Sequence, residues 1–113
     1  MIKTKIIAEI GVNHNGKVSL AKKLIDKAKN CGVDYVKFQI YQTREMALKN
    51  LKKAPYQARN SLTGKENQYK MLQKYELNFN EHLKIYKYCK KKRVKYLASV
   101  FDHNSLKFLE KLK

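Results

Sequence analysis

Three short apolar runs, each followed by a segment with helical periodicity, limit the folds that this chain can adopt. The runs span residues 6–10, 34–40 and 96–101, and helical patterns follow at residues 17–31, 66–75, 78–92 and 103–112. Strands that alternate with helices normally lie parallel, because each helix returns the chain to the same end of the sheet. The sequence therefore predicts an α/β fold of three βα units, with parallel strands and the helices outside.

Capping residues mark where the helices begin and end. Asn78 and Glu81 have the spacing of a capping box, and Asp102 stands where it can cap the last helix. Gly32 follows the first helical pattern and suits the left-handed conformation that ends many helices. These signals fix the boundaries of the elements more closely than periodicity does.

The segment between the second strand and the helix at 66–75 is the least regular part of the chain. It runs from Tyr41 to Lys65 and contains Pro55, the only proline, with a short helix expected near residues 44–50. Loops of this length are often functional. We expect the segment to contribute to a binding site.

The 113 residues suffice for one domain, and their charge limits the classes of partner. The net charge is +17, but only three of the 26 basic residues are arginine, and the lysines occur in nearly every segment. Nucleic-acid readers usually concentrate charge on one face and use arginine for bidentate contacts. We interpret the charge mainly as a solvated lysine surface, which disfavours nucleic acid as a partner; a basic nucleic-acid-binding module is the alternative.

Location and redox state follow from simple features. No apolar run of about 18 residues is present, and the chain enters its first strand without a signal-peptide pattern, so we expect a cytoplasmic location and no membrane contact. Cys31 and Cys89 lie far apart in the sequence, without paired metal-binding spacing. We expect two reduced and mostly buried thiols.

Polar side chains stand near the carboxyl end of each predicted strand. They are Glu9 in the first strand, Lys37 and Gln39 in the second, and Ser99 in the third. The carboxyl ends of parallel strands meet at one edge, where α/β folds bind ligands. Together these groups can bind an anionic small molecule and transfer a proton. The alternative for Glu9 and Lys37 is a buried structural ion pair.

Two further residues are candidates for the same region. His14 lies in the polar loop Val12-Asn13-His14-Asn15-Gly16, where it either lines the site or supports the turn by hydrogen bonding. Phe101 stands at the end of the third strand and can form a pocket wall. His82 and His103 are expected to be structural.

Four motifs in this order closely resemble the N-terminal part of the sialic acid synthase family, which includes N-acetylneuraminate, legionaminate and pseudaminate synthases and spore-coat polysaccharide enzymes. The motifs are Ala8-Glu9-Ile10-Gly11-Val12-Asn13-His14-Asn15-Gly16, Ala21-Lys22-Lys23-Leu24-Ile25, Val36-Lys37-Phe38-Gln39 and Gln68-Tyr69-Lys70-Met71-Leu72. The resemblance covers essentially the whole chain. It implies a TIM barrel enzyme of carbohydrate biosynthesis, a transferase that condenses phosphoenolpyruvate with an N-acylated amino sugar such as N-acetylmannosamine, forming a nonulosonic acid and phosphate.

The resemblance also implies roles for individual residues. Glu9 falls on a catalytic acid that works on the sugar, and Lys37 falls on a lysine that contacts phosphoenolpyruvate. Gln39 and Asn60 fall on residues that face the sugar. At the third strand the family reads Ser-Thr-Pro-Phe where this chain has Ala98-Ser99-Val100-Phe101. Ser99 thus keeps a hydroxyl for the phosphate donor and Phe101 keeps the wall, whereas Val100 replaces the proline.

Length is the main departure from the family. A full barrel has eight βα units in about 250 residues, so residues 1–113 are expected to form a partial barrel domain without the metal-ligand strands and the C-terminal domain. The resemblance implies a divalent metal, Mn²⁺ or Mg²⁺, with ligands beyond residue 113, and a homodimeric enzyme. We expect the chain to be an opening fragment that does not turn over alone; a non-catalytic remnant that completes a barrel with another chain is the alternative.

Overall fold

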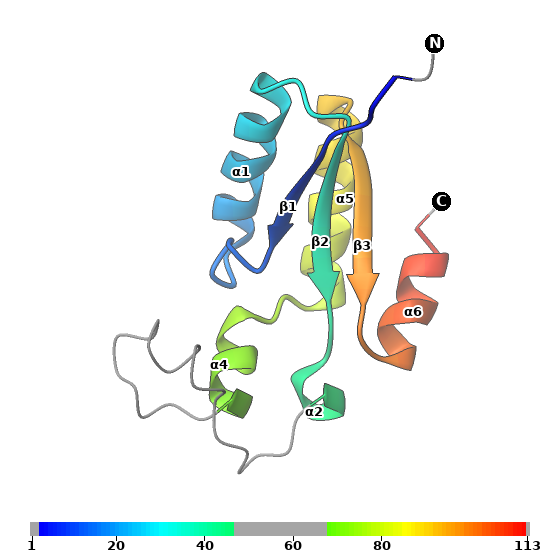
Figure 1. Ribbon diagram of the computed structural model, residues 1–113. Coiled ribbons are helices and arrows are strands. Elements are labelled where there is room, and N and C mark those ends of the chain that lie inside the picture. Colours follow the sequence, from blue (N-terminus) through cyan, green and yellow to red (C-terminus); the bar gives the residue numbers. More distant parts are fainter. Residues whose placement is uncertain (1–2, 47–67, 113) are drawn as a thin grey trace.

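The computed structural model describes residues 3–46 and 68–112, and it contains the predicted alternation of strands and helices (Figure 1). Asn60 and most of the irregular segment lie outside the described residues. The elements are β1 (Ile7–Gly11), α1 (Val18–Asn30), β2 (Tyr35–Ile40), α2 (Thr43–Met46), α4 (Gln68–Tyr75), α5 (Phe79–Lys92), β3 (Lys95–Val100) and α6 (His103–Glu110).

The three strands form one parallel sheet in the order β1-β2-β3, as predicted. The central strand β2 alternates strictly: Val36, Phe38 and Ile40 are fully buried, whereas the residues between them are partly exposed. Side chains alternate between the faces of a strand, so one face of β2 is apolar and the other polar.

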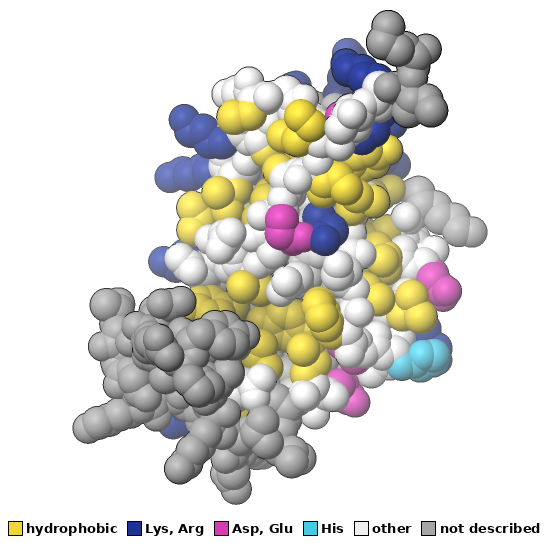
Figure 2. All heavy atoms as spheres, viewed as in Figure 1, with side chains coloured by type: hydrophobic (Ala, Val, Ile, Leu, Met, Phe, Trp, Pro, Cys, Tyr) yellow, Lys and Arg dark blue, Asp and Glu magenta, His cyan; other side chains and the backbone are white. Residues whose placement is uncertain are grey.

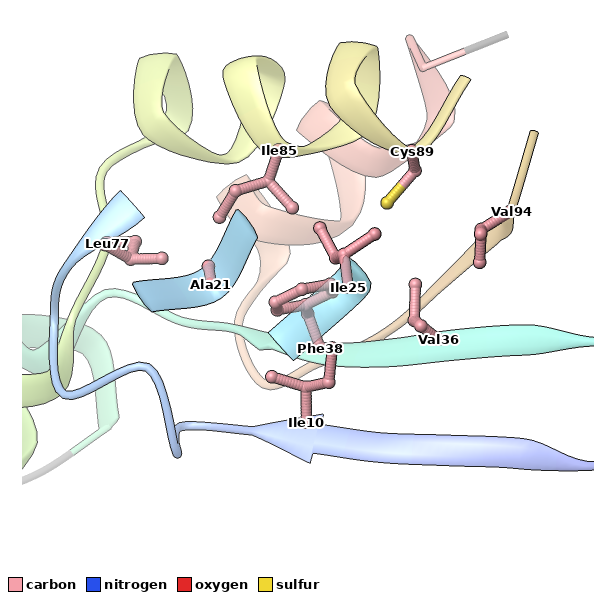
Figure 3. Packing of buried hydrophobic residues seen from close by; sticks show 9 residues of the cluster. All are labelled: Ile10, Ala21, Ile25, Val36, Phe38, Leu77, Ile85, Cys89 and Val94. Atoms are coloured by element: carbon pink, nitrogen blue, oxygen red, sulfur yellow. The ribbon is translucent and has the colours of Figure 1, made fainter. Parts of the chain in front are cut away.

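Helices α1 and α5 pack on the apolar face of the sheet (Figure 3). Ala21 and Ile25 from α1 meet Ile85 and Cys89 from α5 above Phe38, and all five are completely buried. Burial of a side chain as large as Phe38 stabilises the fold by about 1.5–3 kcal/mol. The core therefore lies between the sheet and these two helices.

The predicted caps are present. The side chain of Asn78 accepts a hydrogen bond from the Glu81 N–H and the Glu81 carboxylate accepts one from the Asn78 N–H, which completes the capping box of α5. Asp102 caps α6 by accepting the Ser105 N–H at 2.8 Å. Gly32, with φ +76°, follows the last turn of α1 in the left-handed conformation.

The expectation for the cysteines is only half correct. Both thiols are free, and Cys89 is buried in the core, where burial raises the pKa of its thiol to about 12. Cys31 is exposed, because it lies in the turn after α1 and not on the apolar stripe of the helix. Its prediction as a buried residue was wrong.

Two glycines with positive φ provide a matched test of how the loop after β1 packs. A Cβ added to Gly16 would lie 2.5 Å from the carbonyl oxygen of Lys74 at the end of α4, whereas a Cβ on Gly32 meets nothing within 4 Å. Both alanine variants carry the left-handed strain of about 1–2 kcal/mol. We expect Gly16→Ala to lower the free energy of unfolding by at least about 1 kcal/mol more than Gly32→Ala in urea titrations. Equal losses would show that α4 does not press on this loop.

His82 predicts a dependence of stability on pH. Its side chain is 1% exposed, and burial lowers its pKa to about 4, with His14 acting in the same direction. In the unfolded chain the pKa of this histidine is near 6.5, so the unfolded chain binds a proton there more readily than the folded chain does. The stability that the neutral His82 allows is therefore complete above about pH 6.5 and is lost as the pH falls toward 4. A loss of roughly 3 kcal/mol is expected from this group.

Replacement of His82 by leucine isolates this contribution. In urea titrations at pH 7 and pH 4.5, His82→Leu should lose less stability on acidification than the parent chain. An unchanged difference between the two pH values would mean that His82 is not the responsible group.

Candidate functional site

The polar side chains predicted from the sequence lie on the face of the sheet opposite the core. Parallel pairing places Glu9 across from Lys37, and Gln39 across from Ser99. Figures 1 and 2 view the molecule from this side, and no described helix lies in front of the sheet. The prediction that residues of all three strands gather on one surface is confirmed.

Glu9 and Lys37 form an ion pair at the centre of this surface. The distance between Glu9 Oε2 and Lys37 Nζ is 2.7 Å, and the side chains are 48% and 35% exposed. Figure 2 shows one acidic and one basic side chain in contact here, surrounded by hydrophobic and uncharged groups. The ion pair between neighbouring strands, which was the alternative interpretation, is present, but it is not buried. Exposed pairs contribute about 1 kcal/mol or less to stability. Because both side chains are partly exposed to solvent, they remain accessible to a ligand.

A backbone irregularity in β1 positions the Glu9 carboxylate. The register shifts between Glu9 and Gly11, so that Gly11 pairs with Phe38 directly after Glu9 has paired with Lys37. Gly11 has φ +54°, a conformation that glycine adopts at little cost. Its missing side chain leaves room between two functional groups, because a Cβ there would lie 3.4 Å from Glu9 Oε1 and 3.7 Å from Gln39 Nε2.

Gln39, Ser99 and Phe101 continue the surface toward the carboxyl ends of β2 and β3. Gln39 and Ser99 are partly exposed, and Phe101 is 48% exposed directly after β3. The Phe101 N–H donates to the Ile40 carbonyl at 3.2 Å, which extends the ladder between the two strands by one step. The surface thus presents an amide, a hydroxyl and an aromatic ring beside the ion pair.

His14 supports the loop and does not line the surface. It is 1% exposed and stacks against Phe38, which belongs to the core, at 6.2 Å between ring centres. Its Nδ1 accepts the Gly16 N–H at 3.0 Å, and burial lowers its pKa. Of the two interpretations of His14, the turn support is confirmed.

Three contacts that sequence reasoning missed hold the segment after β2. The Asp102 carboxylate accepts the Gln42 N–H at 2.8 Å in addition to capping α6. The Tyr41 hydroxyl donates to the Leu72 carbonyl at 2.8 Å, and the Thr43 hydroxyl donates to the Glu76 carboxylate at 2.6 Å. Each joins residues that are 31 to 60 positions apart, and no local pattern announces such a pairing.

Neither a metal site nor a membrane span occurs in the part of the chain that the structure describes. Within residues 3–46 and 68–112, no three histidine, cysteine, aspartate or glutamate side chains gather closely enough to hold a metal ion. The described residues therefore assign no ligand to the divalent cation that the resemblance implies. No described helix has the length and apolar character needed to cross a bilayer.

Comparison with known proteins identifies relatives along the whole chain. This chain is 43% identical over 112 residues to the N,N'-diacetyllegionaminic acid synthase of Campylobacter jejuni, and the match covers 99% of this chain and 33% of the relative. It is 33% identical over 110 residues to the human N-acetylneuraminate-9-phosphate synthase, and this match covers 95% of this chain and 29% of the relative. The chain thus spans about a third of the length of the curated relatives that it matches.

The fold and a family model agree with these relatives. The crystal structure of the N-acetylneuraminic acid (sialic acid) synthetase of Leptospira borgpetersenii, in complex with citrate, superposes with a TM-score of 0.73 at 28% identity, over 98% of this chain and 34% of that one. The three βα units are those of a partial TIM barrel, as the resemblance implied. The NeuB family model matches residues 24–113. The chain therefore belongs to the NeuB family.

Proposed function

We propose that this chain supplies part of the active site of a synthase that condenses phosphoenolpyruvate with an N-acylated amino sugar, releasing phosphate and forming a nonulosonic acid. The observation that carries the proposal is the accessible Glu9–Lys37 ion pair beside Gln39 and Ser99 on one sheet face. The names of the relatives, which are synthases of acids of this class, support it.

Lys37 and Ser99 have the chemistry that the phosphate donor requires. An ammonium group has three donors, so Lys37 can keep its 2.7 Å contact with Glu9 and still bind a phosphate or carboxylate oxygen. Ser99 lies on the neighbouring strand, two register positions beyond the residue that pairs with Lys37, and brings a hydroxyl donor. We assign phosphoenolpyruvate to these two residues.

Glu9 and Gln39 are assigned to the sugar. The Glu9 carboxylate can accept a hydrogen bond from a sugar hydroxyl and transfer a proton as acid or base. The Gln39 amide, on the other side of the space left open by Gly11, can both donate and accept. Asn60, outside the described residues, is proposed as a further sugar contact, and Phe101 as the wall of the site.

The same proposal includes features that the described residues do not supply. They are a divalent metal, Mn²⁺ or Mg²⁺, with ligands beyond residue 113, a homodimeric enzyme and a cytoplasmic location. A bound metal would polarise the sugar aldehyde; the residues of this chain bind and orient the substrates and move the proton at Glu9.

A chimera tests the assignment of Glu9. This chain replaces the matching third of the Campylobacter jejuni synthase, and phosphate release from phosphoenolpyruvate is measured with the amino sugar that the relative accepts. We expect the chimera to turn over and Glu9→Gln to lower kcat at least 100-fold, because general acid–base catalysis contributes about 10²–10⁴-fold. Glu45→Gln is the matched control, since Glu45 is an exposed acid in α2. Near-normal turnover of Glu9→Gln would remove Glu9 from catalysis.

Gly11 is proposed as a positioning residue, and its alanine variant tests that role in the same chimera. An added methyl group strains the φ of +54° and fills the space between Glu9 and Gln39, in van der Waals contact with both. We expect Gly11→Ala to lower kcat at least tenfold, a loss that corresponds to about 1.4 kcal/mol. Gly32→Ala, which carries a similar backbone strain far from the site, should leave kcat unchanged. If both variants lose activity equally, the effect is one of stability and not of position.

A further inference from the structure

A recess lies at the end of the sheet opposite the Glu9–Lys37 surface, where β2 and β3 begin. It has a volume of about 540 Å³, within the 300–1,000 Å³ range of small-molecule sites. Residues from β2, β3, α5 and the end of the chain after α6 line it: Tyr35, Tyr86, Lys90, Arg93, Val94, Lys95, Tyr96 and Leu112. It shares no residue with the Glu9–Lys37 surface.

The lining carries three cations and no acidic residue. In the described part of the chain, Lys90, Arg93 and Lys95 have no carboxylate partner, whereas the nearby Lys92 pairs with Asp26 at 3.3 Å. Lys90 lies over the ring of Tyr86 at 5.2 Å, and Lys95 lies over the ring of Tyr35 at 5.3 Å. The recess therefore combines uncompensated positive charge with aromatic rings.

Arg93 adopts a conformation that favours glycine. It ends α5 with φ +57° and ψ +41°, in the left-handed region where the Cβ of an arginine is strained. A glycine at this position would cap the helix without strain. The arginine therefore occupies this position at a cost to the backbone.

The ring of Tyr96 forms part of the wall of the recess. Its hydroxyl is buried and has no partner among the described residues. Burial raises the pKa of Tyr96, so the hydroxyl stays protonated and can donate. The ring of Tyr96 packs edge-on against Tyr86 at 5.6 Å between centres, so the two rings form one aromatic wall.

We propose that this recess binds a nucleoside phosphate. The three cations suit phosphate oxygens, since guanidinium and ammonium groups form strong charge-assisted hydrogen bonds with them. The tyrosine rings suit a planar base, which stacks on aromatic side chains. Inorganic phosphate alone leaves most of the 540 Å³ unfilled. The site lies outside the proposed synthase surface and does not depend on it.

Calorimetric titration of the full 113-residue chain tests the proposal with three probes, adenosine monophosphate, adenosine and inorganic phosphate. We expect a dissociation constant for the monophosphate at least tenfold below those of adenosine and of phosphate. Arg93→Gly should weaken its binding at least tenfold without lowering Tm, because glycine relieves the strain at φ +57°. Tyr96→Phe, which removes only the buried hydroxyl and keeps the ring, should change it less than twofold. Lys23→Ala is the charge-matched control on α1 and should change it less than twofold.

Other outcomes would overturn the proposal. If adenosine monophosphate binds no more tightly than phosphate, the rings play no part. If Arg93→Gly and Lys23→Ala weaken binding equally, the charge acts diffusely and the recess is not a site. Much tighter binding of a 12-nucleotide RNA, insensitive to Arg93→Gly, would indicate a polyanion surface instead.

Discussion

The burial of one face of β2 is the constraint on which the rest of the structure depends. Val36 and Phe38 are completely buried in the core with α1 and α5, and Ile40 is completely buried further along the strand. A one-residue slip would turn all three to the other face. With the register fixed in this way, Lys37 and Gln39 have to point away from the core. Parallel pairing on both sides then determines their neighbours, Glu9 and Ser99.

The ion pair at the centre of this face shows how little the site contributes to holding the fold together. Glu9 and Lys37 keep much of their surface in contact with solvent, and such pairs are weak in water. The apolar layer on the other side of the same strands supplies the stability. Separation of the two tasks onto opposite faces lets the polar face vary without loss of the core.

Much of this arrangement was predictable from the sequence, because local rules govern it. Alternation in β2, the capping box of Asn78 and Glu81 and the N-cap of Asp102 depend on residues a few positions apart, and all were found where expected. The exposure of Cys31, the bulge at Gly11 and the hydrogen bond from Gln42 to Asp102 were not predicted. These depend on how distant segments pack, which a linear pattern does not record. The roles of Glu9, Lys37, Gln39, Asn60, Ser99 and Phe101 stay predictions.

The carboxylate of Asp102 has a consequence for ligand recognition. It holds the start of the segment after β2 through the Gln42 N–H, and at the same time holds the first turn of α6 through Ser105. The ends of β2 and β3 are therefore tied at a point just beyond Gln39 and Ser99. These two side chains keep their spacing before any ligand arrives, so binding sacrifices less conformational entropy than it would on two independent loops.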